Sequence, residues 1–125
     1  MDRERFERLV ERAVASLPEE FSARLENVDV VVADWPAHHD LARLGLRNRY
    51  ELLGLYQGVP LTARGGHYGL VPPDKITIFQ GPIEAKCRSD ARIMTEIARV
   101  VRHEIAHHFG IGDGRLMELE ANQDD

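Results

Sequence analysis

The stretch of sequence that decides the fold spans residues 103–113 and reads HEIAHHFGIGD. It continues a segment with apolar residues at helical spacing, so we expect a long helix, capped by Ser89 or Asp90, that runs to about Phe109. The buried face of this helix is expected to carry Ile93, Ile97, Val100 and Val101. Gly110 follows directly, at the position where a glycine commonly ends a helix.

Two histidines and a glutamate within this helix form a pattern with a chemical meaning. His103 and His107 are four residues apart, so on a helix they are offset by only about 40° and can share a metal ion. Glu104 lies one step round, within reach of a water beside that ion. This HExxH arrangement is typical of zinc hydrolases, in which the histidines bind the metal and the glutamate is the general base. We therefore predict Zn²⁺ as cofactor, His103 and His107 as ligands, and Glu104 as the catalytic residue.

A third ligand is expected, because a catalytic zinc ion usually has three protein ligands. Asp113 follows Gly110 by three residues, and a turn at that glycine can bring the carboxylate back to the metal. Glu118 and Glu120 are the competing candidates, from a helical turn expected at 115–121. We favour Asp113.

Residues 103–113 resemble the extended zinc motif of the zincin metallopeptidases, in the snapalysin-type variant where aspartate replaces the third histidine of the metzincins. Two further segments, GVPLT at 58–62 and PDKI at 73–76, complete a resemblance to a family of small bacterial zincin-like metallopeptidases. That resemblance covers most of the chain from Leu17 onward.

The resemblance implies an α+β, zincin-like fold with a small mixed β-sheet packed against the HExxH helix and an N-terminal helix. It implies His103, His107 and Asp113 as metal ligands and Glu104 as general base. In zincins an edge strand lies above the metal and pairs with an extended peptide, and the segment 76–80 is the candidate for that strand here.

The remaining pattern of the chain fits such a fold. Apolar periodicity predicts helices at 2–17 and 18–24 and strands at 28–33, 51–56 and 75–80. The segment 37–50 is expected to be a loop with at most one helical turn, and Gly81 and Pro82 are expected to end the third strand. The glycine-rich loop 61–74 carries Arg64, His67 and Tyr68, which either close over the metal or stay in an exposed loop.

Composition bounds the class of protein. The 125 residues are enough for one domain, 1–125, and the charge of −5 argues against nucleic acid as a partner. The single cysteine, Cys87, excludes an intramolecular disulfide. With no signal-peptide pattern and no apolar stretch of membrane length, the expected compartment is the cytoplasm. Cys87, near the start of the motif helix, is expected to take no part in the site; the alternative is a reactive thiol, because a helix N-terminus would lower its pKa.

The function that follows is hydrolysis of a peptide bond in a peptide or protein substrate. Glu104 is expected to take a proton from water and pass it to the leaving amine. Two alternatives stay open: a zinc amidohydrolase for a small or modified substrate, and a catalytically silent, metal-stabilised binding module. Few residues follow His107, so we expect no C-terminal subdomain, and a partner protein or a second copy could complete the cleft.

Overall fold

The computed structural model describes residues 1–58, 73–112 and 118 of the chain. Its helices are α1 (Arg3–Ala15), α2 (Glu19–Ser22), α3 (His38–Arg43), α5 (Gln80–Lys86) and α6 (Asp90–Phe109), with 3-10 turns η1 (Ala23–Leu25) and η2 (Arg49–Glu51). Its strands are β1 (Val28–Ala33), β2 (Gly54–Gln57) and β3 (Asp74–Phe79). Within these residues no helix combines the length and the apolar character needed to cross a membrane.

The three strands form one mixed sheet in the order β1-β3-β2. Strand β3 pairs in parallel with β1 and antiparallel with β2, which confirms the expected α+β fold with a small mixed sheet. The proposal that the segment 76–80 supplies an edge strand is wrong, because β3 is the central strand. Its side chains are buried on both faces, Ile76 and Ile78 on one and Thr77 and Phe79 on the other, as is typical of a central strand. Among the strands that the structure describes, β1 and β2 lie at the two edges of the sheet, and β2 is the edge strand that contacts α6.

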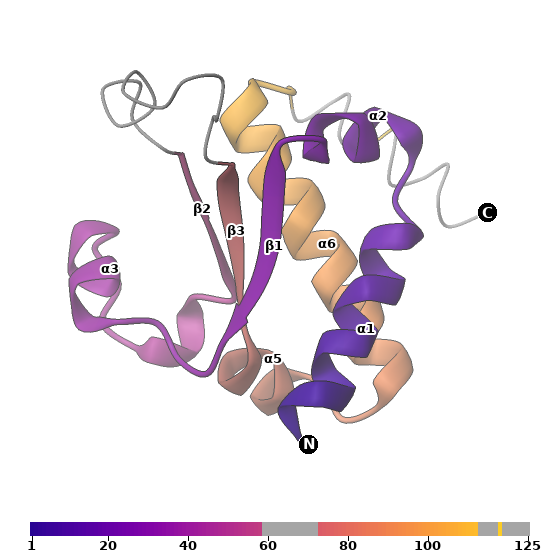
Figure 1. Cartoon of the computed structure of the whole chain (residues 1–125). Helices are drawn as coiled ribbons and strands as arrows, with labels where there is room; N and C mark the ends of the chain where they lie inside the picture. The colour runs from indigo at the N-terminus through magenta and orange to yellow at the C-terminus, as the bar shows by residue number, and fades with distance from the viewer. Residues whose placement is uncertain (59–72, 113–117, 119–125) are drawn as a thin grey trace.

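The main core lies between the sheet and the two long helices, which cover the same side of the sheet in Figure 1. Helix α1 contributes Phe6, Leu9, Val10 and Ala13, and α6 contributes its predicted face of Ile93, Ile97, Val100 and Val101. From the sheet, Ile76 and Ile78 are completely buried in this core. Packing of both helices on one face therefore fixes the rotation of α6 about its axis.

A smaller core covers the opposite face of the sheet. It consists of Leu41, Leu52, Leu55 and Phe79. Helix α3 supplies Leu41 and lies on that side in Figure 1. This helix occupies residues 38–43 of the segment 37–50, which was expected to be a loop with at most one helical turn. A single buried leucine gave too weak a periodic pattern to reveal it.

Helix ends follow the expected local chemistry. The side chain of Asp2 caps α1 by accepting the Arg5 N–H at 2.8 Å, and the Ser89 hydroxyl caps α6 by accepting the Arg92 N–H at 3.2 Å. Gly110 ends α6 in the left-handed conformation with φ 71°, which a residue with a Cβ adopts at a cost. The predicted capping by Ser89 and Gly110 is thus confirmed.

Helix α5 was not expected, because Gly81 and Pro82 suggested a break. Both lie in its first turn, where the N–H that proline lacks has no partner within the helix. A Cβ at Gly81 would lie 2.4 Å from Cε2 of Trp35, so the glycine lets the indole pack on the helix start.

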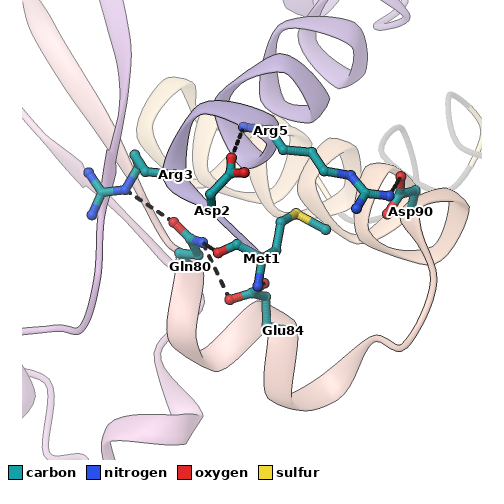
Figure 2. A network of polar contacts seen from close by, with 7 residues as sticks. All are labelled: Met1, Asp2, Arg3, Arg5, Gln80, Glu84 and Asp90. Carbon is teal, nitrogen blue, oxygen red and sulfur yellow. Dashed lines mark hydrogen bonds and ion pairs between the residues drawn. The ribbon is translucent and has the colours of Figure 1, made fainter.

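A polar network joins the starts of α1 and α5 (Figure 2). The buried Gln80 accepts from Arg3 Nε at 3.1 Å and donates to the Met1 carbonyl at 2.9 Å. The Met1 ammonium lies 3.1 Å from Glu84 Oε1. These contacts fasten α1 to the end of β3 and complete the frame that holds α6.

Candidate metal centre

The end of α6 presents the histidines and the glutamate on one side. His103 and Glu104 are half-buried and His107 is exposed, while Ile105 and Ala106 between them are in the core. The helix is regular from Asp90 through Phe109, so the four-residue spacing places both imidazoles on neighbouring turns of one face. Core packing of the intervening residues fixes the rotation of the helix, so that Glu104 reaches strand β2.

The Glu104 carboxylate is anchored on the edge strand. Its Oε1 accepts the backbone N–H of Tyr56 at 2.9 Å. The Phe79 N–H donates to the Leu53 carbonyl at 2.9 Å, and in an antiparallel pair the backbone groups face the partner strand at every second residue. The main-chain groups of Gly54 and Tyr56 therefore point away from β3. One of them, the Tyr56 N–H, donates to Glu104.

Burial of Glu104 raises the pKa of its carboxyl above the ordinary value of 4.5. The hydrogen bond from Tyr56 and the charges of His107 and His103 act in the opposite direction and offset part of that rise. A carboxylate with a raised pKa accepts a proton more readily at neutral pH, which suits a general base.

A cluster of rings lies next to this carboxylate. The Tyr56 ring stacks on His108 with a centroid distance of 3.8 Å and an interplanar angle of 16°. The Tyr56 hydroxyl donates to Asp74 Oδ2 at 2.7 Å, and His108 Nε2 lies 3.9 Å from the same oxygen. Phe109 meets both rings edge-on. His108 is thus a packing partner of strand β2.

A groove of about 200 Å³ runs beside the candidate base. One wall is formed by η2 and the start of β2, and the other by α6. The lining residues are Glu51, Leu52, Leu53, Gly54, Arg99, Val100, His103 and Glu104. The groove therefore opens onto two of the three residues that the motif singled out, His103 and Glu104, while His107 is not among its lining residues.

The donors that the structure describes fit a zinc site in part. Two imidazoles on one helical face are nitrogen ligands of the kind that zinc prefers, and Glu104, held by Tyr56, sits beside them. Among residues 1–58, 73–112 and 118, no three His, Cys, Asp or Glu side chains form a metal cluster. The favoured third ligand, Asp113, and the alternative Glu120 lie outside the described residues, as does the loop segment 64–68, while Glu118 is exposed.

The family comparison bears on this arrangement directly. Residues 25–123 match the family of zincin-like metallopeptidases. The chain belongs to that family. The match includes all three strands of the sheet and helix α6, so the zincin-like fold and the family resemblance are both confirmed. A comparison with curated proteins gives no match.

Three residues near the candidate site of this zincin-like protein were not predicted from the sequence: Tyr56, Asp74 and Gly54. Of these only Gly54 left a signal, since an isolated glycine in a strand often marks a close backbone approach. Cys87 is buried at the end of α5, and burial raises the pKa of its thiol, which contradicts the alternative of a thiol with a lowered pKa.

Proposed function

We propose that this zincin-like protein is a zinc-dependent peptidase. In this proposal His103, His107 and Asp113 bind Zn²⁺, and Glu104 is the general base. The observation that carries it is the hydrogen bond from the Tyr56 amide to Glu104, because that bond places a half-buried carboxylate beside two histidines and at the rim of an edge strand.

The chemistry follows from the chain's own groups. Zn²⁺ bound there would supply Lewis acidity toward the scissile carbonyl and the attacking water. Glu104 takes the proton that the water loses and delivers it to the leaving nitrogen. The Tyr56 N–H holds carboxylate oxygen Oε1, and we assign the proton to Oε2. The raised pKa of Glu104 favours this transfer near neutral pH.

The substrate docks along β2 in an extended conformation. On the side of β2 away from β3, Gly54 and Tyr56 present backbone groups, and main-chain pairing at an edge strand binds peptides of many sequences. The main chain of Gly54 is the group that we assign to this pairing. The groove between β2 and α6 then receives a substrate side chain between Leu53 and Val100.

Metal analysis combined with cleavage of a diverse peptide library tests the proposal. The wild-type protein is expected to bind about one zinc ion per chain and to cleave peptides. Glu104→Gln should retain the zinc and lose turnover by about 10²–10⁴-fold, the usual contribution of a positioned general base. His103→Ala and His107→Ala should each lose stoichiometric zinc.

The same experiment separates the alternatives. Unchanged turnover in Glu104→Gln would remove this residue as the base, and retained zinc in both histidine variants would remove the metal site. Cleavage of small amides without cleavage of peptides would indicate an amidohydrolase. Zinc binding that stabilises the fold without any turnover would indicate a binding module.

A further inference from the structure

Three residues of α6 form a ridge that strand β2 follows. Val100, Glu104 and His108 are spaced by four residues along the helix, so they lie on successive turns. Gly54 and Tyr56 lie two residues apart on β2, so they face the same side of the sheet. Each of these five residues takes part in a contact between the strand and the ridge, and the candidate base is the middle member of the ridge.

The first contact, one turn before Glu104, depends on a missing side chain. A Cβ at Gly54 would lie 2.4 Å from Cγ1 of Val100 and 3.3 Å from the Thr77 carbonyl oxygen. Valine is branched at Cβ and its χ1 is stiff, so it cannot easily turn aside. Only glycine at position 54 lets the backbone of β2 approach the helix this closely.

The second contact, one turn after Glu104, is made by an aromatic ring. Tyr56 stacks on His108, and its hydroxyl donates to Asp74 on the central strand. This ring therefore ties β2 to the helix end and to β3 together. Between the two contacts, the Tyr56 N–H reaches Glu104 Oε1 at 2.9 Å.

We propose that Gly54 and Tyr56 are positioning residues for Glu104: the close packing at Val100 and the ring stack at His108 fix the distance between strand and helix, so that the Tyr56 N–H orients the carboxylate. The catalytic consequence rests on the proposed peptidase function. The positioning itself is a property of the metal-free chain and is measured without a substrate.

Amide hydrogen exchange by NMR on the metal-free protein tests the positioning. The Tyr56 amide points away from β3, so its protection depends on Glu104, whereas the Leu55 and Gln57 amides face β3 and serve as internal controls. Glu104→Ala should speed exchange of the Tyr56 amide by about tenfold, the effect of losing a hydrogen bond to a charged group. The exchange rates of the two control amides should stay unchanged.

Variants of the two positioning residues test the contacts. Tyr56→Leu and Gly54→Ala should speed exchange of the residue-56 amide and lower kcat with little change in KM, whereas Tyr56→Phe, which keeps the ring stack, should stay close to wild type. Two controls make the same chemical changes elsewhere. Tyr50→Leu alters an exposed tyrosine. Gly58→Ala adds a Cβ that would meet Asp74 and His108 only at ordinary contact distances of 3.7 and 3.9 Å among the described residues, so it adds a methyl group beside the ring cluster without a collision.

A compensating change guards against a general folding defect. If Gly54→Ala acts through the collision with Val100, then Gly54→Ala with Val100→Ala should recover the slow exchange and the kcat of Val100→Ala alone. Failure of this rescue, or an unchanged exchange rate of the Tyr56 amide in Glu104→Ala, would overturn the proposal. A wild-type protein without turnover would instead overturn the peptidase function, and the exchange data would still decide the positioning.

Discussion

The Glu96 carboxylate links two helices behind the candidate site, and its replacement by glutamine tests how firmly that link holds. Glu96 Oε1 accepts from Lys86 Nζ and from Arg99 Nε, each at 3.0 Å. Lys86 is the last residue of α5, so the carboxylate joins α5 to α6. Arg99 also lines the groove beside the candidate base, which connects this ion pair to the proposed substrate side of the helix.

The size of the effect follows from exposure. Only 12% of the Glu96 side chain is exposed, but 54% of Lys86 and 38% of Arg99 are, so solvent screens both partners. Glutamine keeps the size and one acceptor oxygen and loses the charge. We therefore expect Glu96→Gln to lower the free energy of unfolding by about 1 kcal/mol at pH 7. For a chain of this length, that lowers Tm by about 4 °C.

The pKa of Glu96 determines how the difference in stability between wild type and Glu96→Gln should change with pH. Burial alone would raise the pKa of Glu96, but hydrogen bonds from Arg99 and Lys86 hold it below the ordinary 4.5. A carboxyl with a depressed folded-state pKa stabilises the protein above the unfolded value and loses that contribution as the pH falls through the folded value. The gap between wild type and Glu96→Gln should thus be full at pH 7 and shrink below pH 4.5.

Chemical denaturation of the metal-free proteins at pH 7 and at several acidic values measures this gap. Glu7→Gln, a matched change at an exposed position of α1, should alter stability by less than about 0.5 kcal/mol. Equal stability of wild type and Glu96→Gln at pH 7 would refute the reasoning, as would a gap that stays constant through acidification.

Three further predictions concern other parts of the molecule. Gly81→Ala would bring a Cβ within 2.4–2.7 Å of three Trp35 ring atoms, so calorimetry should show a loss of about 1–3 kcal/mol. Gly112→Ala, whose new Cβ has no atom of the described residues within 4 Å, should melt close to wild type. Because burial raises the pKa of Cys87 above 9.0, alkylation by iodoacetamide should be slower in the folded than in the unfolded protein and still accelerate above pH 9.0; equal rates would contradict this. Zinc at 100 times its Kd should stabilise the wild type by about 2.7 kcal/mol, reversibly on chelation; an equal rise in Tm for His107→Ala would exclude that histidine as a ligand.

Local chemistry made much of the fold predictable. The caps at Ser89 and Gly110 and the apolar face of α6 depend on residues within one helix, so the sequence reveals them without knowledge of the rest of the chain. The order of the strands depends on pairing between distant segments. The segment 76–80 was assigned to an edge from family resemblance, although the apolar side chains on both of its faces already favoured a central position.

In the candidate site too, the features that depend on local sequence were predictable and those that depend on distant segments were not. The spacing of His103, Glu104 and His107 is local, and α6 presents these residues as predicted, although the ligand roles stay predictions. The contact from Tyr56 to Glu104 could not be predicted, because it uses a backbone N–H that nearly every residue carries. Which amide reaches the carboxylate is decided by how β2 rests on α6, and that depends on packing across 48 residues of sequence.

The burial of Ile105 and Ala106, with 0% and 1% exposure, has a consequence for how this segment can evolve. The same two turns of helix carry the proposed chemistry on one side and part of the core on the other. Inserting one residue just before Ile105 would rotate everything beyond it by about 100°. His107 would then take the direction that His108 has now, and the buried Ala106 would take the exposed place of His107. Point substitutions can silence the proposed chemistry and keep the fold, whereas a change of length disturbs both, so the spacing of the motif is constrained by stability as well as by chemistry.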